Sequence, residues 1–519
     1  MANKSVFASF VGKMLPKAEV RNAHGAPAYA LSPRHKLAQL AVTGTLAPIF
    51  YADAQAQLAD VLKLAHEVDG AFLAKTAVYA RRRGQMKDMP ALLLAILSML
   101  QTNDFARAFP LVVDNGKMLR TFVQIMRSGA VGRKSLGTRP KKLIEGWLET
   151  ASDIEIMRSA VGNDPSLADV VKMVHPRPKD PARQAFYGWL IGKPYDVAAL
   201  PAIVAAFEAF KRDPQAPLPD VPFQMLTALP LTKQHWAAIA EKAGWQMLRM
   251  NLNTFLRHDV FTVEGFAERL AERLRDERAI KRAKAFPYQL MATYAAADQG
   301  VPAVVRDALH DAMETAVANV PAIEGRVVVC PDVSGSMGSP VTGHRKGATT
   351  KMRCIDVAAL VAAAMLRANR QARVLPFEQK VVPVNLEPRD TVMTNAGKLA
   401  AIGGGGTNCS APLVQLVAER AKVDLVLFVS DNQSWVDMNG GGRGGTAMMA
   451  AWDKLKAFNP KARLVCLDIQ PYGTTQAAER EDVMNIGGFS DVVFEAIAAF
   501  AKGESGAGHW LSEIEKIEL

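Results

Sequence analysis

An apolar run that ends in a cluster of oxygen-bearing side chains most constrains how this chain folds. Residues 327–330 (Val-Val-Val-Cys) are too few for an amphipathic helix, and they predict a strand buried on both faces at the centre of a parallel sheet. Asp332, Ser334 and Ser336 follow at alternate positions. Ligands of open α/β sheets bind beyond the carboxyl ends of the strands. We therefore expect these oxygens to suit a hard divalent cation such as Mg²⁺.

Asp-x-Ser-x-Ser alone is a weak signal, because serine-rich turns after strands are common. Two later stretches strengthen it. Four glycines at 403–406 lead to Thr407, and a second apolar run, which follows Asp424 at 425–429, delivers Asp431. The set resembles the metal-ion-dependent adhesion site (MIDAS) of von Willebrand factor A domains. That resemblance implies hydroxyl ligands from Ser334, Ser336 and Thr407, with Asp332 and Asp431 binding the metal directly or through water.

The C-terminal part of the chain alternates between strand and helix patterns, which predicts a Rossmann-like parallel sheet with helices on both faces. We predict strands at 326–330, 372–377, 423–429 and 463–469, and helices at 354–369, 411–421 and 447–458. The four cysteines (Cys330, Cys354, Cys409 and Cys466) show no metal-ligand spacing, and we expect them to be reduced core residues. No Gly-Lys-Ser/Thr follows the glycine run, so nucleotide binding is unsupported.

The first part of the chain shows helical periodicity from about residue 37 to residue 320. Apolar side chains recur at i, i+3, i+4 and i+7, for example in residues 58–68 and 89–100, and short Gly, Pro, Asp and Asn breaks separate the segments. Helices of similar length in succession predict stacked hairpins of the HEAT or armadillo kind, although no clean residue-level repeat is present. The proline-rich stretch 213–222 predicts a rigid connection between two helices.

The excess positive charge lies entirely in this helical part. Residues 1–322 carry 41 Lys or Arg and 30 Asp or Glu, whereas residues 323–519 carry 21 of each. No acid lies between Asp114 and Glu145, where there are eight cations: Lys117, Arg120, Arg127, Arg133, Lys134, Arg139, Lys141 and Lys142. If the fold gathers them on one face, they predict a sequence-independent attraction for a polyanion. The alternative to a polyanion-binding surface is that these residues form the solvated face of two helices.

Several helical stretches resemble the TROVE module, notably 83–90, 136–147, 170–178 and 247–252. A TROVE module followed by an A-type domain resembles the Ro autoantigen family and its bacterial relatives. The resemblance predicts two domains, a TROVE module at 1–322 and an A-type domain at 323–519. It also implies that the helical repeats form a ring closed by the A-type domain.

The same resemblance implies binding of small noncoding Y-type RNAs on a basic outer surface, and of single-stranded ends of misfolded RNAs in a central hole. His175, in a His-Pro-Arg-Pro turn, would lie on that surface with Arg158, Lys172 and Arg177 contacting phosphates. Prolines 176 and 178 cannot continue a helix, so the turn presents His175 stiffly. A lone exposed histidine is more often incidental. An exoribonuclease partner is also implied.

Three functions remain in competition on the sequence. We favour a non-enzymatic RNA-binding protein in noncoding RNA quality control, and we expect it to be a monomer. We expect a cytoplasmic location because no signal-peptide core or membrane-length apolar run is present. The alternative is a protein-interaction scaffold using a metal-bridged A-type domain, against which the charge asymmetry argues. A metal-dependent hydrolase fits poorly, since the site lacks clustered acids and an evident general base.

Overall fold

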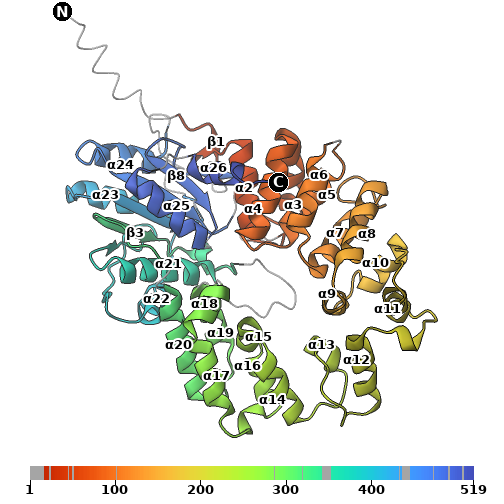
Figure 1. Ribbon diagram of the computed structural model, residues 1–519. Coiled ribbons are helices and arrows are strands. Elements are labelled where there is room, and N and C mark those ends of the chain that lie inside the picture. The colour runs from red at the N-terminus through yellow and green to blue at the C-terminus, as the bar shows by residue number, and fades with distance from the viewer. Residues whose placement is uncertain are drawn as a thin grey trace, which may run out of the picture. The chain divides into compact units, whose positions relative to one another are not determined.

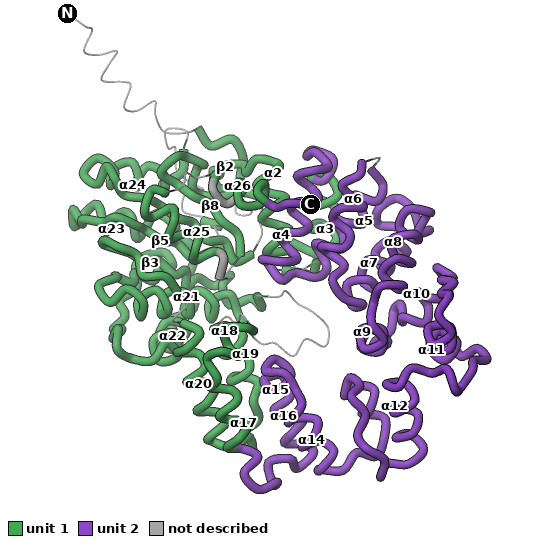
Figure 2. Tube along the Cα trace, in the orientation of Figure 1, with its two compact units in different colours: residues 1–64, 268–516 green, residues 65–267, 517–519 purple. Residues whose placement is uncertain are grey.

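The computed structural model groups the chain into two compact units, residues 1–64 with 268–516 and residues 65–267 with 517–519 (Figure 2). The structure describes residues 17–22, 25–44, 46–49, 52–100, 102–283, 285, 287–317, 320–341, 352–431, 433–434, 445–470, 473–488, 491–504 and 508–519, without the side chains of 288, 491, 492, 509 and 510. No helix in these ranges is long and apolar enough to cross a membrane. The first unit includes residues 268–322, so the boundary between the compact units does not coincide with the domain boundary predicted at 322/323. That domain boundary stays a prediction.

A five-stranded parallel sheet forms the centre of the first unit, in the order β4-β3-β5-β6-β8 (Figure 1). Its strands are β3 (Val327–Pro331), β4 (Arg373–Val374), β5 (Leu425–Ser430), β6 (Arg463–Asp468) and β8 (Val483–Gly487). The three central strands β3, β5 and β6 are buried along nearly their whole length, as their apolar sequences predict. All four predicted strands are therefore confirmed.

Two details of this sheet differ from the expectation. The regular part of β4 is shorter than the predicted 372–377, although Leu375 N–H still donates to Val329 O at 2.8 Å and Phe377 N–H to Pro331 O at 3.1 Å. Proline at 376 has no N–H to continue the regular ladder. Strand β8 was not predicted because Asn485 interrupts its apolar run. The structure satisfies that buried amide with Thr475 Oγ1 and Ala477 O.

Helices cover the sheet, and the three helices predicted in this region are confirmed within a few residues. They are α21 (Cys354–Ala368), α23 (Ala411–Ala418) and α24 (Ala447–Lys456); α22 (Val392–Ala400), α25 (Asp491–Lys502) and α26 (His509–Glu515) accompany them. Trp452 of α24 is fully buried in a core cluster with Cys330 and Phe428. All four cysteines are buried and free, as predicted.

A segment from the start of the chain belongs to this unit, which the sequence did not suggest. Strand β1 (Val20–Arg21) pairs with β2 (Pro27–Ala30), and β2 pairs with β7 (Thr474–Thr475). Helix α2 (Pro33–Thr43) packs against β8. Among the described residues, the unit also contains the α-helices α18 (Glu277–Ala283), α19 (Pro287–Ala296) and α20 (Ala303–Val317). The sequence boundaries between the two units fall within α3 (Ala54–Glu67) and α17 (Phe266–Arg275).

The second unit is helical throughout its described residues. Its α-helices are α4 (Gly70–Arg82), α5 (Asp88–Leu97), α6 (Asp104–Val112), α7 (Gly116–Ser128), α8 (Thr138–Thr150), α9 (Asp153–Ser159), α10 (Leu167–Val174), α11 (Pro181–Ile191), α12 (Ala202–Arg212), α13 (Phe223–Leu226), α14 (Lys233–Lys242), α15 (Trp245–Met250) and α16 (Leu252–Arg257). The proline-rich stretch connects α12 to α13, as predicted. Closure of the repeats into a ring stays a prediction.

Sequence-encoded caps place the helices that carry the basic residues. Ser152 and Ser166 begin α9 and α10 with capping boxes. In each box the serine hydroxyl accepts a hydrogen bond from the backbone N–H of the third helical residue, and the carboxylate of that residue accepts one from the serine backbone N–H. Gly129 ends α7 in the left-handed conformation, with φ of 86°. Helix α7 packs against α5, α9 and α10, so the basic helices form one packed group.

Candidate metal centre and basic surface

The sheet topology brings the predicted oxygen ligands to one edge. Strands β3 and β5 are parallel neighbours, so Asp332 and Asp431, which follow them, emerge at the same end of the sheet. The glycine-rich loop reaches this end through two backbone bonds, from Gly335 N–H to Gly405 O at 3.0 Å and from Gly404 N–H to Val333 O at 3.1 Å. Thr407 therefore lies in a loop fixed against the loop after β3.

Glycine is favoured at 405 by its backbone conformation, and a larger residue there would also displace the Glu378 side chain. Its φ is 75°, and a Cβ atom there would lie 1.9 Å from the Glu378 carboxylate. The exposed glycine run is held against the loop after β3 by its backbone bonds at Gly404 and Gly405.

The five predicted ligands are buried, with relative exposures of 0% for Asp332, 1% for Ser334, 7% for Ser336, 3% for Thr407 and 2% for Asp431. Ser334 N–H donates to Asp332 Oδ1 at 2.9 Å, and the hydroxyls of Ser334 and Ser336 lie 3.3 Å apart. The Ser336 hydroxyl also bonds to the Asp431 side chain. The structure therefore brings together the carboxylates and both serines.

The two carboxyl groups are destabilised as anions by their surroundings. Burial raises the pKa of Asp332. Burial, and then the charge of Asp332, raise the pKa of Asp431 to about 7. None of the ion pairs among the described residues involves either carboxylate.

These features fit a divalent cation. A buried pair of carboxylates needs a compensating positive charge, and the donors around it are all oxygens, the ligands that Mg²⁺ prefers. The described residues contain no group of three or more His, Cys, Asp or Glu that could hold a metal. The predicted set is of another kind, with two carboxylates and three hydroxyls.

Four supporting residues were missed by sequence reasoning: Ser430, Ser434, Asn22 and Gln39. Ser430 Oγ donates to Asp332 Oδ2 at 2.5 Å, and its position as the last residue of β5 could have revealed it. Asn22 Nδ2 donates to Ser434 O at 2.5 Å, and Ser434 Oγ donates to Thr407 O at 3.3 Å. Gln39 of α2 donates to Asp468, a further buried carboxyl at the end of β6, whose pKa is raised by burial. No sequence signal connects Asn22 or Gln39 to these loops.

The predicted basic residues all lie on the packed group of helices α7 to α10 or on the segments that join and follow them. Lys117, Arg120 and Arg127 come from α7; Arg133 and Lys134 from the loop after it; Arg139, Lys141 and Lys142 from α8; Arg158 from α9; Lys172 from α10; and His175 and Arg177 from the turn that follows. Helix α7 packs against α10, which places Arg127 and Lys172 on neighbouring helices.

Three of these cations donate hydrogen bonds to backbone carbonyls of the second unit. Arg120 donates to Val161 O at 2.6 Å, Arg133 to Leu136 O at 3.0 Å, and Arg139 to Thr102 O at 2.5 Å. Arg120 and Arg133 are also partly buried. Arg120 and Arg139 each tie two segments of backbone together, and Arg133 bonds within its own loop. These residues therefore have a structural role in addition to the predicted RNA-binding one.

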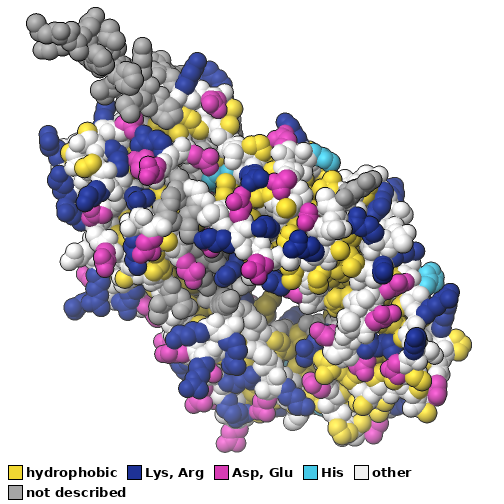
Figure 3. Space-filling view, turned by 45° about the horizontal axis from the view of Figure 1, so that its top comes forward, with side chains coloured by type: hydrophobic (Ala, Val, Ile, Leu, Met, Phe, Trp, Pro, Cys, Tyr) yellow, Lys and Arg dark blue, Asp and Glu magenta, His cyan; other side chains and the backbone are white. Residues whose placement is uncertain are grey.

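The other predicted cations, Lys117, Arg127, Lys134, Lys141, Lys142, Arg158, Lys172 and Arg177, are exposed. His175 is also exposed and ends α10 in the left-handed conformation, with φ of 58°, and its N–H donates to Val171 O at 2.9 Å. The expected stiff turn is therefore present. On the face drawn in Figure 3, Lys and Arg side chains are spread over both units with Asp and Glu among them.

An open parallel sheet with buried hydroxyl and carboxylate loops at its carboxyl edge defines an A-type domain joined to a helical module. Residues 326–501 match the model of the Ro60 vWA domain. The resemblance to Ro proteins is confirmed.

Two relatives extend the similarity beyond the A-type domain. The chain is 26% identical to the RNA-binding protein RO60 of Deinococcus radiodurans, over 94% of this chain and 96% of that protein. The crystal structure of the Deinococcus radiodurans RO (RSR) protein aligns with a TM-score of 0.64 at 23% identity, covering 91% of this chain and all of that one. The second comparison supports the fold alone.

Proposed function

We propose that this chain is a non-enzymatic RNA-binding protein. The observation that carries the proposal is the group of exposed cations on α7 to α10, at Lys117, Arg127, Lys134, Lys141, Lys142, Arg158, Lys172 and Arg177. Exposed lysines and arginines neutralise phosphates without regard to sequence. The name of the Deinococcus relative supports the same ligand.

The finer proposal concerns which RNA is bound and where. Y-type small noncoding RNAs bind the basic surface of α7 to α10, and single-stranded ends of misfolded RNAs bind in a central hole, in the service of RNA quality control. The exposed His175 and Arg177 support a contact with structured RNA, since a neutral imidazole can bond a sugar or base edge. The protein acts as a cytoplasmic monomer with an exoribonuclease partner.

Salt dependence tests RNA binding directly. The affinity for a structured RNA falls with rising salt, with a log–log slope of ~0.9 per phosphate contact on a duplex. Fluorescence anisotropy at several ionic strengths measures the slope, and affinity indifferent to salt would contradict the proposal. His175→Ala and Arg177→Ala weaken binding of a Y-type RNA more than binding of a single-stranded tail. Equal losses would argue against separate sites.

We also propose that the A-type domain holds a divalent cation, Mg²⁺, through Asp332, Ser334, Ser336, Thr407 and Asp431. The support is the buried pair of carboxylates beside two hydroxyls. When bound, the cation supplies positive charge and an electrophilic position. The chain's own contribution is to exclude water and to orient the oxygens through Ser430 and the bonded glycine loop.

A protein-interaction scaffold remains the second candidate, because such a cation could accept a carboxylate from a partner protein. Purifying the protein at low salt and extracting nucleic acid separates the two. Co-purifying RNA supports the first function, whereas its absence together with metal-dependent capture of a carboxylate-bearing protein supports the second.

A further inference from the structure

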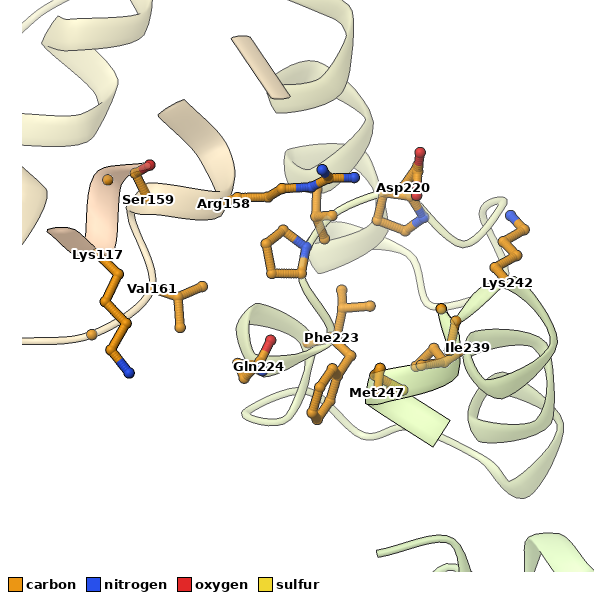
Figure 4. A pocket seen from close by; sticks show the side chains of 18 of the residues that line it. Lys117, Arg158, Ser159, Val161, Asp220, Phe223, Gln224, Ile239, Lys242 and Met247 are labelled. Carbon is orange, nitrogen blue, oxygen red and sulfur yellow. The ribbon is translucent and has the colours of Figure 1, made fainter. Parts of the chain in front are cut away.

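The second unit contains a cavity that the proposed RNA surface does not explain. Its volume is about 750 Å³, within the ~300–1,000 Å³ range of small-molecule sites. One wall comes from α7 and α9, and the other from the end of the proline-rich stretch together with α13, α14 and α15. The cavity lies wholly inside this unit (Figure 4).

The two walls differ in chemistry. Phe223, Ile239 and Met247, from α13, α14 and α15, make one wall apolar, and Figure 4 shows them on that side. The Phe223 ring is half-buried and packs edge-to-face on Trp236, with centroids 6.0 Å apart. This contact holds the aromatic ring in place while part of it stays exposed at the cavity.

Cations surround the apolar wall. Lys117, Arg158 and Lys242 are exposed where they line the cavity, and Asp220 is the one carboxylate among its lining residues. Figure 4 shows Arg158 extending from α9 toward the segment that carries Asp220. The N-terminal end of α7, with its positive end of the helix dipole, also opens here through Asn115 and Gly116.

Arg120 adds a partly desolvated positive charge. Its guanidinium lines the cavity, burial lowers its pKa, and its Nε has no hydrogen-bond partner in the part of the chain that the structure describes. A partly buried cation favours a nearby anion more strongly than an exposed one does, because less solvent screens it.

We propose that this cavity binds one unpaired nucleotide of a single-stranded RNA, with its base against Phe223 and its phosphates at Lys117, Arg158 and Lys242. Aromatic rings stack on any base, and cations along the same groove hold the backbone. The inference rests on the proposed RNA-binding function and assigns a site to the unpaired strand.

The placement of the cations favours a nucleotide over an acidic peptide. Lys117 and Arg158 belong to α7 and α9, which also carry the exposed basic surface. At 1.5 Å per residue, Lys117 and Arg127 stand about 15 Å apart along α7. A strand of a few nucleotides can therefore reach from that surface into the cavity.

The test compares two labelled probes by fluorescence anisotropy: decauridylate, and a decamer of abasic ribose phosphates with the same charge. Phe223→Ala should weaken decauridylate about 5- to 150-fold and the abasic decamer less than about twofold, because only stacking is lost. Phe261→Ala, which removes another half-buried phenyl of the same unit, is the matched control and should leave both affinities unchanged.

Further variants guard against an effect on folding. Met247→Gln, at a half-buried position on the same wall, should lower the preference for decauridylate several-fold with an unchanged circular dichroism spectrum. Lys242→Ala should weaken both probes equally and reduce the salt slope by ~0.7. If Phe223→Ala or Met247→Gln weakens both probes equally, or neither, the cavity does not hold a base.

A structured hairpin RNA separates this inference from the proposed function. If the wild-type protein binds neither hairpin nor decamer, the RNA-binding function itself fails. If it binds the hairpin with strong salt dependence and does not distinguish the two decamers, the nucleotide site is wrong and the RNA-binding function stands.

Discussion

Replacing Asp431 by asparagine should stabilise the metal-free protein and abolish its response to Mg²⁺. The carboxylate is 2% exposed and lies beside Asp332, and its pKa is about 7 instead of the ordinary 3.8. At ~1.4 kcal/mol per pKa unit, the ionised Asp431 costs the metal-free fold about 4 kcal/mol. Asparagine keeps the oxygen that accepts from Gln433 N–H and removes the charge.

The pH dependence of this destabilisation follows from the linkage between proton binding and folding. Because the carboxyl pKa is raised in the folded protein, the folded state holds its proton more tightly than the unfolded chain does. The destabilisation is therefore absent below about pH 4, grows between pH 4 and 7, and is complete above pH 7. Asp431→Asn should match the wild type at pH 4 and exceed it at pH 8, both in chelator.

Magnesium should narrow the difference in stability between the wild type and the variant. At 100 times its dissociation constant, a cation that binds only the folded state adds about 2.7 kcal/mol to the wild type. The variant has lost one of two carboxylates and should gain less than about 1 kcal/mol at the same concentration.

Urea unfolding followed by circular dichroism, with EDTA or Mg²⁺, measures both effects. Glu481→Gln, an exposed carboxylate of the same unit, is the control and should change the free energy of unfolding by less than about 0.5 kcal/mol. A variant less stable than the wild type in chelator at pH 8, or stabilised equally by Mg²⁺, would refute the reasoning.

Two further predictions follow from the contacts. Asn22→Ala should weaken Mg²⁺ binding several-fold, because Asn22 holds Ser434, which in turn donates to the carbonyl of Thr407; a Mg²⁺ titration of thermal stability that matches the wild type would contradict it. Arg133→Ala should cost about 1–3 kcal/mol of stability through its lost bond to the backbone, whereas the exposed Lys142→Ala should leave stability unchanged and reduce the salt slope of RNA binding by about 1. Melting curves and anisotropy titrations separate these outcomes, and a stable Arg133→Ala with a reduced slope would reverse the two roles.

The central strands and the order of the site loops could be read from the sequence because their signals are local. A run such as Val327–Cys330 is apolar at every position, and only a strand buried on both faces uses such a run. Asp332 and Asp431 directly follow their strands, so predicting those strands also placed the two carboxylates at one edge. Strand β8 was not predicted because Asn485 breaks its apolar pattern. The tertiary structure brings Thr475 and Ala477 to that amide, where they form hydrogen bonds with it.

The basic run at residues 117–142 shows what charge spacing in the sequence does not predict, namely the partner of each cationic side chain. Charge spacing predicted a cationic region, but it could not separate Arg133, whose guanidinium bonds backbone, from Lys142, which is exposed. A side chain's partner depends on which backbone carbonyl the fold brings near it, and composition does not carry that information.

The sequence by itself therefore determined the strand–helix alternation, the oxygen-bearing side chains that follow the strands and the location of excess charge, since each depends on residues that are near neighbours in the chain. Tertiary structure alone decided that Asn22 and Gln39 support loops more than 400 residues away, and that Phe223 faces Arg158 across a cavity. Such pairings arise from packing of distant segments, whose free energy depends on the whole fold and leaves no spacing to read.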